Sequence, residues 1–476
     1  MAGADHAVAQ APWSMSATEL ARAYKAHELS PVEVLDAVLA RCEQLNPRVN
    51  AIVTFDTDGA RRAARASEVR WRNGAALGPL DGVPLTVKDS IQVGGMRTTW
   101  GSRLFADHVP AEDELPVARL RRQGAVIVGK TNVPEFTLHG YAHNALFGTT
   151  RNPWDPRLTP GGSSGGAAAA VGAGLCPLAI GTDGGGSIRR PSGHVGLVGL
   201  KPSTGRVARA NGFPAVLYDF EVIGPIARTT PDAALLFAAI AGPDPRDRSS
   251  LAYPAAASEI EMEPRPQRVL YVPRFGGSPV DPEIAAHVAE AARNLEALGH
   301  TVAEGEAPFD LAALDRIWSV VGPAGLAALL RNHPGWQSLV QEPLRRIAEQ
   351  GAVLQAADYV DALEKVTLIR GELAAAFTRH DLILTPCFAA LPWPADATHP
   401  ETIDGKPVGP RAHAVFTAFA NAAGLPGISV PCRPARNGLP IAMQMVGRYG
   451  AEELLLSLAL QYERAHPWAD RWPTLD

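Results

Sequence analysis

The sequence predicts an α/β protein with one large domain over residues 1–476. Short apolar segments of strand length alternate with amphipathic segments of helical length, which is typical of a sheet covered by helices. Apolar residues make up 46% of the chain and charged residues 20%, so the chain has ample material for a core. The sequence shows no internal repeat and no low-complexity segment.

The N-terminal region, about residues 14–50, predicts two amphipathic helices. Residues 16–26 carry the first, which Ser16 or Thr18 can cap. Residues 31–45 carry the second: Ser30 can cap it, a proline takes the first helical position and a glutamate follows in the first turn. Both helices therefore have start signals as well as an apolar face.

The next region, about residues 51–245, carries most of the strand signals and is expected to be the catalytic core. Residues 80–88 predict a turn and then a short buried strand that ends at Lys88. Further helices are expected at 118–123 and 167–173, the second rich in alanine. Further strands are expected at 125–130, 175–180 and 195–200.

A Pro-, Ala- and Glu-rich segment over about 244–268 predicts a connection to the C-terminal part of the chain. A strand is expected at 269–272, and a helical excursion over about 282–380. The sheet is then expected to return over about 381–470. Its strands there are predicted at 381–386, 427–431 and 441–446.

Charge and cysteine usage exclude several classes of protein. The net charge of −5 provides no basic field for nucleic acid or acidic lipid. The four cysteines are far apart in sequence, which favours a reducing compartment over disulfides or a zinc site. No signal-peptide pattern and no apolar run of about 20 residues is seen. We expect a cytoplasmic protein that binds neither nucleic acid nor membrane.

Two glycine-rich segments carry serines 24 residues apart: Ser163 within 160–166 and Ser187 within 181–189. Clustered glycine amides can converge on one point as donors, as in an oxyanion hole. A serine beside them is placed for acyl transfer if a base takes its proton. The candidate base is Lys88, which follows mostly apolar residues; burial would lower its pKa and keep it neutral. Alternatively, Lys88 is a strand-end lysine that only reaches water.

The motifs resemble those of the amidase signature family. The similarity covers about residue 15 to Trp468. It rests on residues 82–84, 87–89, 148–154, 160–166, 181–189, 199–202, 224–228 and 421–426. The resemblance implies a mixed, twisted, multi-stranded sheet with helices on both faces, and hydrolysis of amide bonds without a cofactor or metal.

The resemblance also implies roles for residues at the matching positions. Ser187 is the expected nucleophile, Ser163 is the bridging serine in a cis peptide after Gly162, and Lys88 is the base. The backbone N–H groups of Gly184, Gly185, Gly186 and Ser187 are the expected oxyanion hole. Ser164, Asp183 and Arg189 are expected to support the loop.

Two other motifs offer competing sites. Ser164 lies in a G-x-S-x-G pattern, the nucleophile elbow of α/β-hydrolases, but a proline-rich segment precedes it where that elbow needs a strand. Glu135, His139 and His143 are spaced to present metal ligands on a helix, but Pro134 and Gly140 weaken a helix there. We expect a substrate-entrance loop instead, lined by Phe136, Tyr141 and Phe147.

The expected substrate is a small amide with an apolar acyl or aryl group. Phe213, Leu217 and Tyr218 belong to an apolar segment that could form its pocket, or could simply be core. The main expectation is a free-standing amidase, monomer or homodimer, that could also cleave carbamates or esters. The alternative is the glutaminase component, the A subunit, of a tRNA-dependent amidotransferase; Ala414 stands where that pattern places a carboxylate for the glutamine amino group. A non-catalytic binding scaffold is a remote alternative.

Overall fold

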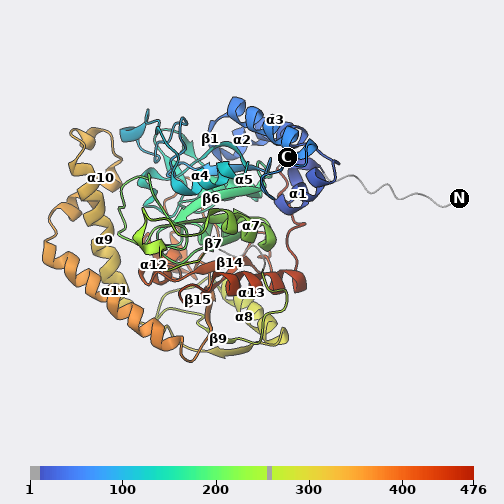
Figure 1. The fold of residues 1–476 in the computed structure, drawn as a ribbon. Helices are drawn as coiled ribbons and strands as arrows, with labels where there is room; N and C mark the ends of the chain where they lie inside the picture. Colours follow the sequence, from blue (N-terminus) through green and yellow to red (C-terminus); the bar gives the residue numbers. More distant parts are fainter. Residues whose placement is uncertain (1–10, 255–259, 476) are drawn as a thin grey trace.

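The computed structural model describes residues 11–254 and 260–475, which form one large α/β domain (Figure 1). Within these residues an 11-stranded mixed sheet has the order β1-β3-β2-β6-β8-β7-β14-β15-β11-β9-β10. Strands β2, β3 and β6 are parallel, whereas β8 and β15 run antiparallel to their neighbours. The predicted fold class is confirmed, and the sheet is mixed as the family resemblance implies.

The strands of the sheet are short and mostly buried. In chain order they are β1 (Ile52–Phe55), β2 (Pro84–Lys88), β3 (Val126–Thr131), β6 (Leu178–Asp183), β7 (Val198–Lys201), β8 (Val222–Ala227), β9 (Arg268–Tyr271), β10 (Thr301–Glu304), β11 (Leu382–Pro386), β14 (Gly427–Pro431) and β15 (Ala442–Gly447). Two small hairpins, β4 (His143–Asn144) with β5 (Gly148–Thr149) and β12 (Thr402–Ile403) with β13 (Lys406–Pro407), lie outside the sheet.

Helices surround the sheet. They are α1 (Ala17–Lys25), α2 (Pro31–Val49), α3 (Thr57–Arg72), α4 (Leu115–Arg122), α5 (Gly165–Gly172), α6 (Arg189–Val195), α7 (Thr230–Ile240), α8 (Pro282–Ala297), α9 (Leu311–Arg331), α10 (Glu342–Ala352), α11 (Ala356–Ala376), α12 (Ala418–Ala422) and α13 (Glu452–Ala465). Ser16 and Ser30 cap α1 and α2 through capping boxes with Glu19 and Glu33. These caps explain why both helices start where the sequence predicts.

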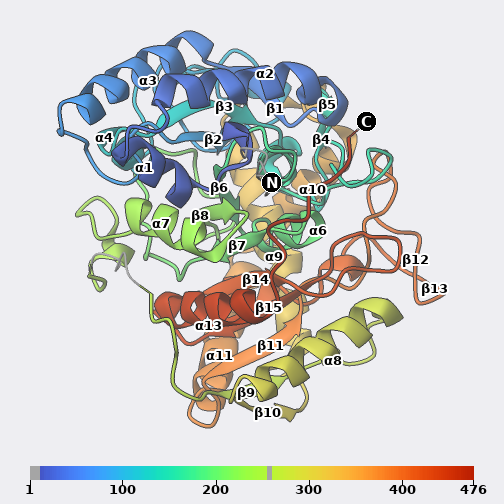
Figure 2. The ribbon, with the colours of Figure 1, turned by 90° about the vertical axis from the view of Figure 1, so that its right-hand side faces the viewer.

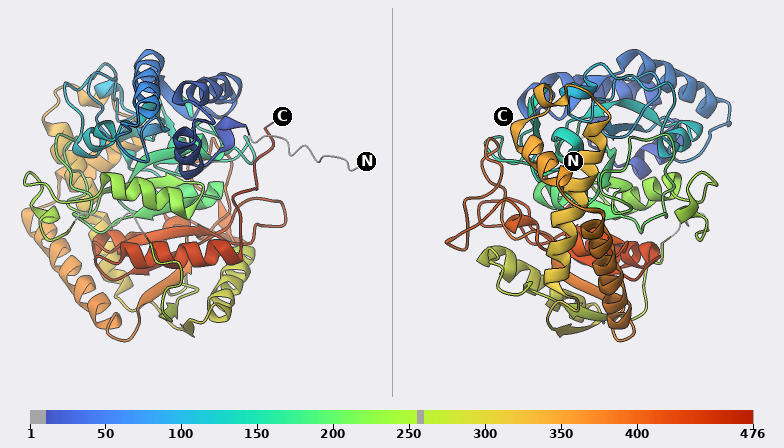
Figure 3. Two further views of the ribbon diagram at one scale, coloured as in Figure 1. Left: turned by 45° about the vertical axis from the view of Figure 1, so that its right-hand side comes forward. Right: turned by 90° about the vertical axis from the view of Figure 1, so that its left-hand side faces the viewer.

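The two faces of the sheet bury different side chains. Ala179 and Ile226 pack with the alanines of α5 in one apolar cluster, whereas Leu178 and Ile180 join a larger cluster with residues of α7 and α13. Because side chains alternate along a strand, α5 and α6 cover one face and α7 and α13 the other. Figure 3 (left) shows α7 in green and α13 in red in front of the sheet. The alanines of α5 allow that helix to approach the sheet closely.

The two ends of the sheet are covered differently. Figure 2 shows α2 and α3 over the β1–β3 end and α8 beside β9 and β10 at the other. Helices α9, α10 and α11 stand together at one side of the molecule (Figures 1 and 3). Among the described residues, α9 is the one helix long and apolar enough to cross a membrane, and 50% of its most apolar window is buried. Core helices of ordinary domains have the same composition.

Several predicted boundaries need correction. The predicted helical excursion over 282–380 contains strand β10, which pairs parallel with β9 at the sheet edge. The strand predicted at 195–200 starts only at Val198, because residues 189–195 form α6. Elements β1, α3, β8, α7, α12 and α13 and the two hairpins are additional to the predicted ones. Part of the predicted connection over 244–268, residues 255–259, lies outside the described residues.

Both ends of the described chain meet at one corner of the domain. The ring of Trp13 packs edge-on against Trp472, with centroids 5.1 Å apart. The Arg228 guanidinium lies 3.4 Å from the centroid of the Trp472 ring. Asp232 of α7 accepts hydrogen bonds from the first N–H groups of α1. Residues distant in sequence therefore close this corner together.

Candidate active site

Strand pairing brings the two candidate loops to Lys88. Strands β2 and β6 are parallel neighbours, with Val87 paired to Ile180. Both strands end at the same edge of the sheet, which is where α/β proteins place their sites. Lys88 closes β2, and the glycine-rich segment containing Ser187 follows β6 directly.

Three oxygen atoms surround the buried Lys88 amine. Lys88 Nζ lies 2.7 Å from Ser163 Oγ, 2.8 Å from Thr182 Oγ1 and 3.2 Å from the Thr182 carbonyl oxygen. Burial lowers the pKa of Lys88 to about 7, although the carboxylates of Glu221 and Asp183 act to raise it. A substantial neutral fraction can therefore take a proton near neutral pH.

Ser163 lies in a tightly enclosed turn. The Gly162–Ser163 peptide bond is cis, as the family resemblance implies. A Cβ atom at Gly162 would lie 2.3 Å from the Tyr141 carbonyl oxygen, so only glycine fits this position. Ser163 is 1% exposed and Ser187 7%, so the second serine is the more open to a substrate. The Ser164 N–H donates to the Ser187 carbonyl oxygen, which joins the two segments.

The hydrogen bonds of the described residues do not include one between the hydroxyls of Ser163 and Ser187. Contact between Lys88 and Ser163 is therefore observed, and the relay from Ser187 to Ser163 stays a prediction. The Ser164 hydroxyl donates to the Thr182 carbonyl oxygen at 3.1 Å, which fits its expected supporting position. No strand immediately precedes Ser164 in this described part of the chain, so the nucleophile-elbow alternative is wrong.

The expected oxyanion hole needs one correction. The Gly186 N–H donates to Asp183 Oδ1 at 2.7 Å, so this amide is already occupied. Backbone hydrogen bonds are absent for the N–H groups of Gly184, Gly185 and Ser187, among the residues the structure describes. The predicted hole is thus reduced to these three amides. A Cβ atom at Gly186 would lie 2.2 Å from Thr417 Oγ1 at a φ of +116°, so this position requires glycine.

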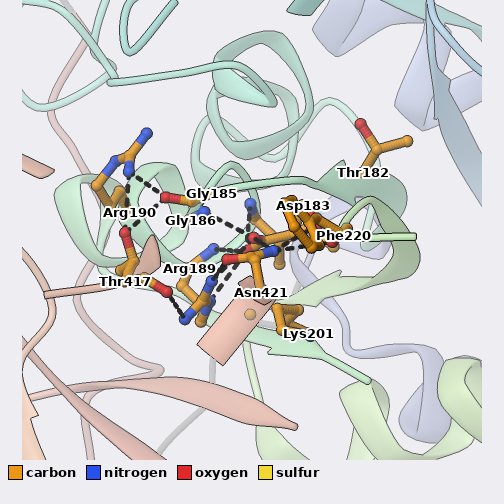
Figure 4. Close-up of polar contacts among 12 residues, drawn as sticks. Thr182, Asp183, Gly185, Gly186, Arg189, Arg190, Lys201, Phe220, Thr417 and Asn421 are labelled. Atoms are coloured by element: carbon orange, nitrogen blue, oxygen red, sulfur yellow. Dashed lines mark hydrogen bonds and ion pairs between the residues drawn. The ribbon is translucent and has the colours of Figure 1, made fainter. Parts of the chain in front are cut away.

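A buried ion pair between Asp183 and Arg189 supports the glycine-rich loop that carries Gly185 and Gly186 (Figure 4). Arg189 donates to both carboxylate oxygens of Asp183, at 2.9 and 3.0 Å. Arg189 also donates to side-chain oxygens of Asn421 and Gln444, each at 2.6 Å. Burial alone would raise the pKa of Asp183, but the Arg189 charge and hydrogen bonds hold it well below its usual range. Both residues are therefore placed as the loop supports that the sequence predicts.

Arg190 connects the two glycine-rich segments, and sequence reasoning missed it. Its Nη1 donates to the Gly185 carbonyl oxygen at 2.6 Å and to Thr417 Oγ1 at 2.9 Å (Figure 4). Its Nη2 donates to the Gly162 carbonyl oxygen at 3.4 Å. Burial lowers the pKa of Arg190 to about 10, so it stays charged at neutral pH. Its position directly after Arg189 in the sequence does not distinguish it from a surface arginine.

The predicted substrate-pocket residues divide into several groups. Phe136 and Phe213 pack against Trp100, with ring centroids 5.5 and 4.7 Å from it. They also line a cavity of about 380 Å³, together with Leu217 and Tyr218. Tyr141 and Phe147 do not line that cavity. The predicted pocket is therefore split between the cavity and a separate loop.

Two apolar side chains occupy the space beside Gly184 and Gly185, as the position of an added Cβ atom shows. The half-buried Trp318 would lie 3.5 Å from a Cβ atom at Gly185. Leu217 would lie 2.6 Å from a Cβ atom at Gly184. Leu217 therefore links the loop to the cavity, whereas Trp318 reaches the loop from helix α9.

The alternative metal site does not form. Glu135 lies in a short 3-10 turn and accepts hydrogen bonds from Ser102 and Gln341. His139 stacks on the Tyr141 ring, with centroids 5.0 Å apart. His143 lies in hairpin strand β4. Without a helix over these residues, their side chains do not share a face.

Comparisons with known proteins identify the family. Residues 33–456 match the family profile Amidase. The A subunit of glutamyl-tRNA(Gln) amidotransferase from Symbiobacterium thermophilum is 37% identical, over 97% of this chain and 99% of its own. The same protein from a Synechococcus species is 39% identical, over 92% and 94%. The chain belongs to the amidase signature family.

Solved structures of this family share the fold. A bacterial aryl acylamidase of the amidase signature family matches with a TM-score of 0.89 and 29% identity, covering 96% of this chain and 97% of its own. A 6-aminohexanoate cyclic dimer hydrolase matches with a TM-score of 0.88 and 29% identity, covering 97% and 99%. This chain is therefore an amidase-type hydrolase built on the fold of its family.

The curated relatives correct two expectations from the sequence. These are a free-standing amidase, and a small-molecule partner without nucleic acid. The matched relatives, at 36–39% identity over nearly the full length, are named as A subunits of glutamyl-tRNA(Gln) amidotransferase. Net charge did not predict this similarity, because a value for the whole chain describes no local surface.

Proposed function

We propose that this amidase signature protein is the glutamine-hydrolysing A subunit of a glutamyl-tRNA(Gln) amidotransferase. The observation that carries the proposal is the identity of 36–39% to proteins of that name, over 92–97% of this chain. Its products would be glutamate and ammonia, with the ammonia passed to the tRNA-linked substrate. The proposal implies that the partners are further protein subunits together with a charged tRNA.

The contacts of Lys88 support acyl transfer to Ser187. In the proposed first step, the Ser187 proton moves through Ser163 to neutral Lys88, and Ser187 Oγ bonds to the glutamine side-chain carbonyl carbon. The negative charge on the former carbonyl oxygen is stabilised by the free amides of the 184–187 segment. The C–N bond then breaks, and the proton held by Lys88 returns through Ser163 to the leaving nitrogen. Ammonia leaves and a glutamyl ester remains on Ser187.

Water completes the reaction by the same route. A water molecule gives one proton through Ser163 to Lys88 while its oxygen bonds to the ester carbon. The bond between that carbon and Ser187 Oγ breaks, and the proton returns to Ser187. Glutamate leaves, and the three side chains regain their starting protonation states. One relay therefore serves both halves of the reaction.

Ala414 affects how tightly glutamine would bind, because it stands where a carboxylate is expected to pair with the glutamine ammonium group. This half-buried residue begins the turn that leads to Thr417, whose hydroxyl donates to the Gly185 carbonyl oxygen at 2.7 Å. A carboxylate at position 414 would lie one turn before Thr417, and we infer that from there it could pair with the glutamine ammonium group. Alanine cannot do so. We therefore expect a high KM for glutamine in the isolated chain.

The test is a substrate panel with the purified chain. Ammonia release from glutamine should exceed the hydrolysis of an aliphatic amide, an anilide and a carbamate, measured as kcat/KM, with Ser187→Ala as the inactive control. Amidotransferase complex from the source organism should transfer the glutamine nitrogen to glutamyl-tRNA(Gln). Preference for an anilide or a carbamate, with no ammonia from glutamine in either preparation, would reject the proposal.

Position 414 gives a sharper version of this test. Ala414→Asp should lower the KM for glutamine about tenfold, because a charge-assisted hydrogen bond contributes about 1.5–3 kcal/mol. The kcat should stay within about twofold, since the change affects bound substrate and transition state equally. Ala414→Asn is the matched control of the same shape without charge. An equal gain in both variants would show that charge is not the cause.

A further inference from the structure

Glu221 is linked by a short chain of hydrogen bonds to the candidate base Lys88, and neither the sequence nor the comparisons give it a role. Its Oε2 accepts a hydrogen bond from Thr182 Oγ1 at 3.3 Å. Its Oε1 accepts one from Arg209 Nη1 at 3.0 Å. Thr182 Oγ1 is also one of the three oxygens around Lys88 Nζ, at 2.8 Å. Glu221 therefore reaches Lys88 through one intervening hydroxyl.

Strand register explains this contact. In the antiparallel pair of β6 and β8, Thr182 pairs with Ile223. Glu221 is two residues before Ile223, so its side chain lies on the same face of the sheet as that of Thr182. Arg209 also donates from Nε to the buried Glu114 at 2.8 Å. Glu221 is thus held on one side by the hydroxyl of Thr182, with that of Thr137 more distant at 3.5 Å, and on the other by an arginine that is itself paired.

The direction of the Thr182 hydroxyl proton decides where the Lys88 lone pair points. A neutral amine has two N–H donors and one lone pair. The Thr182 carbonyl oxygen, 3.2 Å away, can only accept, so it takes one N–H. If the Thr182 hydroxyl gives its own proton to Glu221, its oxygen accepts the second N–H. The lone pair then faces the remaining neighbour, Ser163 Oγ, at 2.7 Å.

We propose that Glu221 is a positioning residue for the base. It accepts the Thr182 hydroxyl proton and thereby orients the lone pair of Lys88 toward Ser163. Arg209 donates to the other carboxylate oxygen and so fixes the position of the Glu221 carboxylate. The inference concerns the base alone, so it does not depend on which amide is the substrate.

The charges around Lys88 fit this role. Glu221 and Asp183 raise its proton affinity, Arg209 lowers it, and burial lowers it most. Glu114 holds Arg209 from the far side. Among these charges, that of Glu221 has the largest effect on the pKa of Lys88. Removal of Glu221 should therefore lower that pKa below its present value of about 7.

The test uses a fluorophosphonate probe, which needs no knowledge of the natural substrate. The Ser187 Oγ–P bond forms, fluoride leaves, and the serine proton moves through Ser163 to Lys88. The rate constant for Ser187 modification therefore reports the base directly. We expect Glu221→Gln to lower this rate constant about 10- to 100-fold, which is less than the roughly 10²- to 10⁴-fold that the general base contributes as a whole.

The relative rates of Glu221→Gln and Glu221→Ala show whether Glu221 acts by accepting the Thr182 hydroxyl proton or only by filling space. Arg209 only donates, so the amide oxygen of Glu221→Gln must face it and the NH₂ group must face Thr182. The Thr182 hydroxyl would then accept, and would turn its own proton toward Lys88. Glu221→Ala leaves that hydroxyl free to rotate. Glu221→Gln should therefore react at least as slowly as Glu221→Ala, whereas a structural role predicts that Gln, with the native shape, reacts faster.

Two further measurements complete the experiment. In a Thr182→Val background, Glu221→Gln should change the rate constant less than about twofold, because the intervening hydroxyl is gone. In the Thr182-containing chain, it should also move the acid limb of the rate–pH profile to lower pH. Asp219→Asn is the control, since Asp219 pairs with Arg370 and should change neither. A Gln variant faster than the Ala variant, or an unmoved acid limb with native melting temperature, would overturn the proposal.

Discussion

Lys88 and Arg189 are two fully buried basic side chains on either side of Thr182 and Asp183, and their surroundings differ sharply. Arg189 makes a bidentate ion pair with Asp183 and donates to further oxygens of Asn421, Gln444 and Thr417. Among the described residues, Lys88 contacts two hydroxyls and one carbonyl but no carboxylate. The charge of Arg189 is neutralised by the Asp183 carboxylate that it contacts. The Lys88 amine is equally buried, but no carboxylate contacts it.

The difference shows how one loop combines a rigid support with a reactive base. A buried charge that is paired and fully hydrogen-bonded can hold a backbone in position. A buried amine without a contacting carboxylate loses proton affinity and can act as a base. The carboxylate nearest to Lys88 in its hydrogen-bond chain is Glu221, and Thr182 separates them. Distance from carboxylate thus distinguishes the two roles.

Replacing the lysine should break the reactive side of this comparison. Lys88→Met should lower the rate of Ser187 modification by a fluorophosphonate about 10³- to 10⁴-fold, because Lys88 is the amine in contact with Ser163. The melting temperature should not fall, since methionine fills the same space without desolvating an amine. A Lys88→Met variant with native reactivity would show that the relay begins elsewhere.

Replacing the arginine should break the supporting side instead. Arg189→Met should lower the free energy of unfolding by about 3–5 kcal/mol, because Asp183 would be left buried and unpaired. Urea denaturation measures this. Arg268→Met is the matched control: its ion pair with Asp381 has the same 2.9 Å separation but is solvent-exposed, so the expected loss is about 0–1 kcal/mol. Equal losses would contradict the distinction between the two pairs.

The pH dependence sharpens the comparison further. The pKa of Lys88 is lowered to about 7, and only its neutral form accepts a proton. Reactivity should therefore fall about tenfold per pH unit below this value and level off above it. The pKa of Asp183 is held well below its usual range, so the support stays charged throughout this window. A flat profile between about pH 5 and 8 would argue against a neutral-lysine base.

Arg190 tests a smaller effect at the junction of the two glycine-rich segments. Arg190→Gln should lower kcat about tenfold, because the Gly185 and Gly162 carbonyl groups lose a charged donor that orders both segments. The KM should change little. Hydrolysis of an activated ester, which depends less on proton return to the leaving group, should be affected equally. An effect confined to KM would place Arg190 in substrate binding.

Local sequence signals predict the strands that deliver the site better than the residues that hold it. Capping boxes at Ser16 and Ser30 and the apolar run ending at Lys88 are local signals, and each element forms as expected. Arg190 meets Thr417, and Arg189 meets Gln444, only through tertiary contacts across more than 200 residues, and no local pattern marks them. Glycine content likewise predicts the oxyanion loop, but it cannot show that the Gly186 amide is bonded to Asp183.

The corner where Trp13, Arg228 and Trp472 stack has a consequence for biosynthesis. Trp472 is the last of these three side chains to be synthesised. Trp13 and Arg228 would therefore stay exposed on the growing chain until Trp472 has emerged and stacked on them. Trp472→Ala should accordingly impair maturation more than its position outside the candidate active site suggests.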